Sequence, residues 1–314
     1  SGIYVHKYDW NINQNIGIKK SKYSLLPNFK AKYSFRKSEK LQLFYTLKNS
    51  FFNTSQLINN YRLIDYNTVF KGNSNLEYVD YHSARLLYTK FNLYKNIILS
   101  SSVGYNKKDK AIKNEVQVVD TDKYLSPVLL DYPDENWNFT GDLYKRYGNF
   151  KIRFTGRLDV FSYKQLINES STAINNYRQT YKSSIETSFK KAPNVKLGYN
   201  FSFNRQKLNS YSYNYSVKEP FVELDCVFLK DFNLKFDYYK NSYKNISDNK
   251  TTYELANASL LYQKENSAWS FKFSAKNIFD TTYKLSNSLS DYQSTETKEY
   301  VFPRVFMFSL SYKL

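Results

Sequence analysis

Few residues of this chain have the types and the spacing that catalysis or metal binding requires. The two histidines, His6 and His82, form no sequence pattern with a serine, a cysteine or a carboxylate that indicates a catalytic triad. Cys226 is the single cysteine, so an intramolecular disulfide is impossible, and two histidines argue against a His-rich metal site. We therefore expect neither enzymatic activity nor a cofactor.

One acidic stretch has ligand types that suit a cation. Its members are Asp120, Asp122, Asp131, Asp134 and Glu135. Calcium prefers such oxygen ligands, but their spacing matches no known calcium loop. A solvated acidic loop is therefore the favoured interpretation of this stretch.

Positive charge is the most abundant chemistry in the chain. Lys and Arg number 46 against 28 Asp and Glu, which gives a formal net charge of +18. Such an excess suits nucleic acid, an anionic membrane surface or an acidic partner. The choice among these depends on the elements that carry the basic residues.

The clearest element is the C-terminal stretch 303–314. From Phe306 onward, one set of residues is apolar and the residues between them are mostly polar: Phe306, Phe308, Leu310, Tyr312 and Leu314 alternate with Met307, Ser309, Ser311 and Lys313. Alternating side chains lie on opposite faces of a strand. A strand of this kind fits a soluble sandwich or an outer-membrane barrel, where the apolar face meets lipid.

The same alternation recurs along the chain and predicts about thirteen strands. Short turns are expected at 36–40, 92–95, 147–149, 190–194, 229–231 and 264–267, and longer loops at 50–79, 106–135, 168–176 and 280–301. Long loops gathered at one end are typical of transmembrane barrels, and a sandwich has no reason to gather them. The fold class predicted is all-β, an antiparallel transmembrane β-barrel with about 13–14 strands in this chain.

Composition agrees with a barrel. Aromatic residues make up 19% of the chain, and the mean hydropathy is −0.65. No run approaches the roughly 18 apolar residues of a transmembrane helix, whereas a barrel strand needs only about 9–11 residues, half of them polar.

The strand faces place the charges. The polar faces carry the basic residues that we take as candidates for the lumen: Lys151, Arg153, Arg157, Lys196, Lys235 and Lys272. On the lipid side each Lys or Arg would cost roughly 2–4 kcal/mol near mid-membrane. Lipid contact is expected instead for Phe154, Leu158, Leu197, Phe201, Cys226, Phe236, Phe273 and Phe308. Because basic and aromatic residues lie on opposite faces, nucleic acid is disfavoured.

Three short motifs resemble TonB-dependent outer-membrane receptors of the Bacteroidetes type. They are Gly72-Asn73-Ser74-Asn75-Leu76-Glu77 with Thr54-Ser55-Gln56-Leu57 upstream, Asn277-Ile278-Phe279-Asp280, and Pro303-Arg304-Val305-Phe306. Ser74 and Val79 stand where the family has proline, and Leu314 stands where it has a terminal phenylalanine. From residues alone, Gly72, Asn73 and Asn75 have the composition of a turn.

The resemblance implies the C-terminal part of a 22-strand barrel domain over residues 1–314, without a plug domain, that serves energised nutrient uptake. Implied partners are outer-membrane lipid and lipopolysaccharide, missing upstream strands and a plug, and TonB through that plug or a surface lipoprotein. Two other functions stay open: a passive 14-strand channel, and a structural subunit of a larger outer-membrane complex. Residues 28–314 give an odd strand count, so either residues 1–10 add a fourteenth strand or the edges pair with further protein. The resemblance favours the second alternative, in which Ile3 to Trp10 pairs with an upstream strand.

Overall fold

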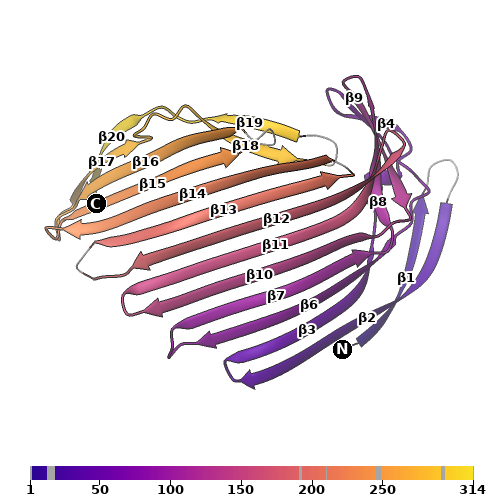
Figure 1. Cartoon of the computed structure of the whole chain (residues 1–314), viewed down its shortest axis with the longest axis horizontal. Coiled ribbons are helices and arrows are strands. Elements are labelled where there is room, and N and C mark those ends of the chain that lie inside the picture. The colour runs from indigo at the N-terminus through magenta and orange to yellow at the C-terminus, as the bar shows by residue number, and fades with distance from the viewer. Residues whose placement is uncertain are drawn as a thin grey trace.

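The computed structural model describes residues 2–12, 18–190, 193–209, 211–244, 249–290 and 294–313. Within them, one sheet of 18 strands dominates, accompanied by a separate two-stranded hairpin. Four of the 18 strands lie in the long loops, and the other fourteen form a continuous curved wall (Figure 1). No helix in this part of the chain is long and apolar enough to cross a bilayer.

Each wall strand pairs antiparallel with the next wall strand along the chain. In order, they are β1 Gly2–Ile12, β2 Ile18–Arg36, β3 Glu39–Ser50, β6 Val79–Asn92, β7 Ile97–Lys108, β10 Asp134–Tyr147, β11 Phe150–Ile167, β12 Ser170–Thr187, β13 Asn194–Leu208, β14 Tyr211–Phe228, β15 Phe232–Lys244, β16 Lys250–Tyr262, β17 Trp269–Lys276 and β20 Val305–Tyr312. The alternative in which residues 1–10 supply a fourteenth strand is seen as β1, which pairs with the first part of β2.

The wall is open. Among the described residues, β1 pairs only with β2, and β20 pairs only with β17, so each leaves one edge unpaired. Gly2 lies opposite Asn28, so β1 covers β2 only as far as that residue. The predicted lipid-facing residues lie along the wall strands, and Phe308, Leu197 and Phe273 are exposed at 68%, 54% and 50%. In a soluble fold such side chains would be covered, which fits a face that meets acyl chains.

Aromatic rings form a row on this apolar face near the short turns. Phe232 contacts Phe228 at 5.4 Å and Tyr262 at 4.9 Å between ring centroids, and Phe271 continues the row 6.1 Å from Tyr262. Near the other end of the wall, the rings of Tyr105 and Trp137 lie 4.5 Å apart. Rings at both ends of an apolar band are typical of membrane-interface girdles.

The long loops lie at the end of the wall opposite the short turns, as predicted, but they are not irregular (Figure 1). The 50–79 loop contains α1 Thr54–Leu57, β4 Tyr61–Asp65 and β5 Thr68–Lys71, and the 106–135 loop contains β8 Ala111–Val119 and β9 Asp122–Leu130. The 280–301 loop contains the hairpin β18 Tyr283–Leu289 with β19 Ser294–Tyr300.

The predicted loop at 168–176 is wrong. A two-residue turn, Asn168 and Glu169, joins β11 directly to β12, and both turn residues have positive φ, 47° and 63°. Such a turn matches the twist of the two strands and lets them extend together. The strands thus project beyond the apolar band, where polar residues occupy both faces and the alternation is lost. For the turn at 190–194, residues 191–192 are outside the described part of the chain, and so is Leu314.

Candidate functional site

A concavity of about 1250 Å³ lies on the polar face of the wall, between β11 and β16. Four of the six predicted lumen residues line it: Lys151, Arg153, Lys196 and Lys235. Arg157 and Lys272 do not. Arg157 lies further along β11 and forms a two-point ion pair with the buried Asp159, with distances of 2.8 and 3.3 Å. Lys272 lies on β17, opposite Ser309 of β20.

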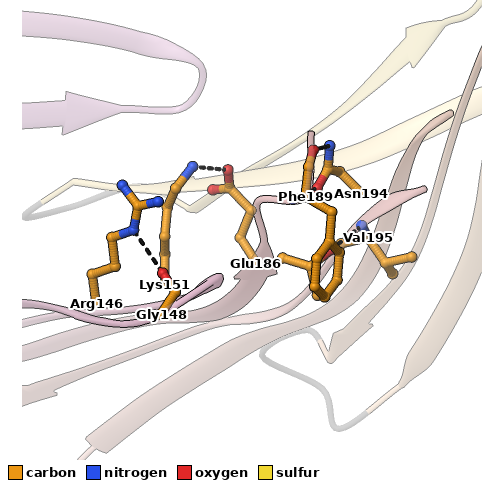
Figure 2. A network of polar contacts seen from close by, with 8 residues as sticks. Arg146, Gly148, Lys151, Glu186, Phe189, Asn194 and Val195 are labelled. Carbon is orange, nitrogen blue, oxygen red and sulfur yellow. Dashed lines mark hydrogen bonds and ion pairs between the residues drawn. The ribbon is translucent and has the colours of Figure 1, made fainter. Parts of the chain in front are cut away.

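Ion pairs cross the strands at the end of the concavity nearest the short turns. Lys151 Nζ lies 2.8 Å from Glu186 Oε1, and Lys196 Nζ lies 2.8 Å from Glu223 Oε1 (Figure 2 shows the first pair). The register places Glu186 between Lys151 and Lys196, so positive and negative side chains alternate from strand to strand. Opposite charges facing each other across strands stabilise a sheet by roughly 0.2–1 kcal/mol per pair.

The short turns beneath this row are held by side chain to main chain contacts (Figure 2). Arg146 Nε donates to the Gly148 carbonyl at 2.8 Å, and Gly148 has a positive φ of 54°. Asn194 closes the next turn, because its Oδ1 accepts from Phe189 N at 2.6 Å and its Nδ2 donates to the Phe189 carbonyl at 3.1 Å. Both contacts keep the strands that carry Lys151 and Lys196 in register.

The remaining acidic residues of the concavity are also partnered. Glu219 accepts hydrogen bonds from Asn200 at 2.9 Å and Asn241 at 3.2 Å, and Asp237 accepts one from Asn257 at 2.8 Å. Lys235 lies 3.5 Å from Asp225. Each carboxylate that lines the concavity therefore already has a donor.

Sequence reasoning missed two aromatic residues on the polar face. Phe221 and Tyr239 line the concavity and lie opposite each other in the register. The Phe221 ring lies over Gly198, where an added Cβ would be 2.2 Å from Phe221 Cζ. Phe221 is two residues before Glu223, so the alternation along β14 is the sequence signal that places its ring on the polar face.

The first family-like motif is a structural joint in the long loop. Gly72 N donates to the Ile58 carbonyl at 3.1 Å, and Asn73 N donates to the Gln56 carbonyl at 2.7 Å. These bonds join the segment 72–77 to the short helix α1, so the structure brings the two predicted motifs together. A Cβ on Gly72 would be 2.2 Å from the Ile58 oxygen, which explains the glycine. Asn75 N bonds to Asn73 Oδ1 at 2.9 Å, as expected of a turn.

The second joint closes the base of the 280–301 loop. The buried Asn277 donates from Nδ2 to the carbonyls of Thr281 and Phe302, both at 2.9 Å, and accepts from Thr281 N at 2.9 Å. Asp280 Oδ1 accepts from Arg304 N at 2.9 Å, so the residues flanking the loop are tied together. Pro303 precedes that contact in the chain, and Phe279 packs its ring 5.9 Å from that of Tyr238.

The acidic stretch forms separate ion pairs. Asp131 lies 3.4 Å from Lys110, Asp134 lies 2.9 Å from Lys113, and Glu135 accepts from Tyr105. Across the described ranges, no group of three or more His, Cys, Asp or Glu side chains is placed to share a metal ion.

His82 belongs to a network on the other face of the wall, near the long loops. Its Nδ1 lies 2.9 Å from Tyr45 Oη, and its Nε2 lies 3.2 Å from Asp109 Oδ2. Lys107 Nζ lies 3.0 Å from the second Asp109 oxygen. The hydrogen bond from Lys107 lowers the pKa of Asp109, and that from His82 acts in the same direction against partial burial. We interpret the network as an ion-paired rim at the end of the apolar face.

No protein-family model matches the chain, and no curated protein matches it in sequence. In fold it is similar to the FrpB iron transporter from Neisseria meningitidis (F3-3 variant), with a TM-score of 0.52 and 10% sequence identity. The match covers 84% of this chain and 44% of the transporter chain, so this chain spans less than half the length of that protein. The fold is accordingly that of an antiparallel β-barrel wall of the outer-membrane type.

Proposed function

We propose that the chain is the C-terminal part of the barrel domain of a TonB-dependent receptor of Bacteroidetes type, in a Gram-negative outer membrane. In this proposal the polar face is one side of a conduit for energised nutrient uptake, and the chain has no enzymatic role. The proposal is carried by the two joints, since one pair of family-like segments braces the first long loop internally and the other pair closes the base of the last long loop at the wall. The fold likeness to an iron transporter supports transport in general.

The unpaired edges support a longer barrel. An open edge in hydrocarbon leaves N–H and C=O groups unsatisfied, each at a cost of several kcal/mol. We propose that β1 and β20 pair with strands outside this chain, and that a plug, lipopolysaccharide, TonB and a surface lipoprotein are the remaining partners. The short turns would then be periplasmic and the long loops extracellular.

Solute depletion from growth medium tests this function. Wild-type cells, cells lacking this gene and cells lacking TonB are compared by mass spectrometry of the medium. A solute class depleted by wild-type cells alone supports energised uptake. Depletion that survives loss of TonB contradicts it.

A passive channel is the second candidate, because the wall has an even number of strands. If residues 1–314 refold alone into a heat-modifiable monomer with steady conductance, the fragment proposal fails and the channel replaces it. Co-purification with fixed partners and no uptake phenotype would favour the structural subunit.

A further inference from the structure

The concavity holds a surplus of positive charge around Ser184 of β12. Every acidic residue that lines the concavity accepts from a donor, and three lysines of the concavity form ion pairs with these carboxylates. Arg153, Lys182 and Lys284 are left over, and the first two are close to Ser184 in the register. Arg153 has no carboxylate within 4 Å in the described part of the chain and lies with Cζ 5.4 Å from the Tyr144 ring centroid. Lys182 has no hydrogen-bond or ion-pair partner among the same residues.

The register places these two cations close together. Arg153 of β11 lies opposite Ser184, and Lys182 is two residues before Ser184 on the same face of β12. Diagonal neighbours of this kind are roughly 7–8 Å apart at the backbone, within the reach of two long side chains. A single oxyanion between them could accept hydrogen bonds from both, and charge-assisted bonds of this kind are about twice as strong as neutral ones.

A flat apolar surface adjoins the cations on the next strand. Gly198 of β13 lies opposite Ser184 on its other side, and the Phe221 ring covers it. Lys196 Nζ lies 5.1 Å from the centroid of that ring, and Lys284 from β18 lies 5.9 Å from the Tyr239 ring. In the register, Ser184 thus lies between Arg153 of β11 and Gly198 of β13, and the Phe221 ring covers Gly198.

We propose that Arg153, Lys182 and Ser184 form a subsite for the carboxylate or phosphate group of a solute whose ring packs on Phe221. The inference rests on the proposed function at one point, namely that a solute enters the lumen of the barrel. Arg153 and Lys182 are both exposed and repel each other weakly, an anion between them would be attracted to both, and the neighbouring carboxylates are already engaged.

Equilibrium dialysis of the full-length protein, purified in detergent from outer membranes, tests the subsite. The probe is phenyl phosphate, with phenol as its neutral counterpart and inorganic phosphate as its ringless counterpart. We expect saturable binding of phenyl phosphate, weakened as salt rises, and at least tenfold weaker binding of phenol. Phe221→Ala should weaken phenyl phosphate several-fold and leave inorganic phosphate unchanged.

Lys182→Gln is the main variant, because Lys182 has no partner in the described residues whose loss would disturb folding. It should weaken phenyl phosphate about fivefold, and its combination with Arg153→Gln at least tenfold. Arg85→Gln is the matched control, since Arg85 is a polar-face cation on β6 that contacts Ser102 outside the concavity. Absence of saturable binding, equal binding of phenol, or equal loss in Arg85→Gln would overturn the subsite. Binding without TonB-dependent uptake would overturn the proposed function alone.

Discussion

The wall and the small sheet in the long loops are built on opposite principles. In the loop sheet of β4, β5, β8 and β9, a cluster of Phe70 on β5, Val116 on β8 and Leu125 on β9 is at most 8% exposed, whereas β4 lies exposed at its edge. Along the wall, outward residues such as Leu197 remain exposed by about half of their surface. The loop sheet carries its own core, whereas the wall holds itself together by strand pairing and leaves its apolar residues to the surroundings.

The difference shows which solvent each region is built for. A small sheet in water gains stability by burying apolar side chains within itself, and the parallel contacts of β5 with β9 and of β8 with β11 lie at the buried Phe70, Leu125 and Val116. A wall in lipid needs every backbone group paired but no internal core. The same chain therefore suits water in one region, where apolar side chains cover one another, and lipid in another, where the apolar face is left for acyl chains to cover.

The largest effect is expected from a charge placed on the outward, apolar face of the wall, and it tests whether that face meets lipid. Leu197→Arg in the full-length protein should cost roughly 2–4 kcal/mol, because the guanidinium enters hydrocarbon. We expect a clear loss of folded protein in outer-membrane fractions, measured by heat modifiability. Ser202→Arg on the polar face of the same strand is the matched control and should fold normally. Equal loss in both variants would contradict the assignment of faces.

Truncating one leucine in each region sharpens the comparison. Leu125→Ala should destabilise the loop sheet by about 2 kcal/mol or more, because a cavity remains in its core. At Leu197→Ala, acyl chains or detergent refill the space, so the cavity contribution disappears. Hydrogen exchange should therefore rise more steeply in β9 than in β13. A larger rise in β13 would refute the separate core of the loop sheet.

The wall was predictable because it repeats one rule. Alternation identified the strands, the short turns and four lysine and arginine residues that line the concavity, since one face must avoid lipid and the other must avoid charge. Of the two alternatives for residues 1–10, the structure shows the additional strand, and its pairing with upstream protein stays a prediction. These features depend only on the parity of residues along each strand.

The loop end was less predictable because both faces there meet water and the alternation disappears. The turn at Asn168 and Glu169 lacks the glycine that marks most such hairpins, and α1 has only four residues. In the site, Lys182 and Phe221 were missed since their importance comes from cross-strand neighbours. Register, which the order of residues does not display, sets those neighbours.

The joint at Asn277 ties the hairpin β18–β19 to the wall, and removing it should have an effect of intermediate size. Asn277→Ala removes three hydrogen bonds and leaves an alanine at a φ of 49°, where no side-chain amide offsets the unfavourable backbone conformation. We expect the free energy of unfolding to fall by about 1–3 kcal/mol. The hairpin β18–β19 should become more sensitive to protease, with the wall unchanged. Asn277→Gly, which tolerates this φ, should recover only the backbone part of the loss. Resistance equal to wild type in both variants would show that the joint is dispensable.

The smallest expected effect is the pH response of the rim between the two regions. Lys107 and His82 hold the pKa of Asp109 below its usual range, so the folded state favours the carboxylate. The resulting stabilisation is present above the unfolded pKa of about 3.9 and is lost as pH falls through the lower, folded pKa.

Because the Asp109 side chain is 50% exposed, we expect this stabilisation to be less than about 1 kcal/mol. Hydrogen exchange at 107–111, referenced to wall amides, should show this loss as the pH falls below about 4 in wild type and not in Asp109→Asn. Asp131→Asn, at a side chain 86% exposed, is the control and should keep the wild-type response. A wild-type slope in Asp109→Asn would place the titrating group elsewhere, and the rim would then contribute nothing to the boundary between wall and loop sheet.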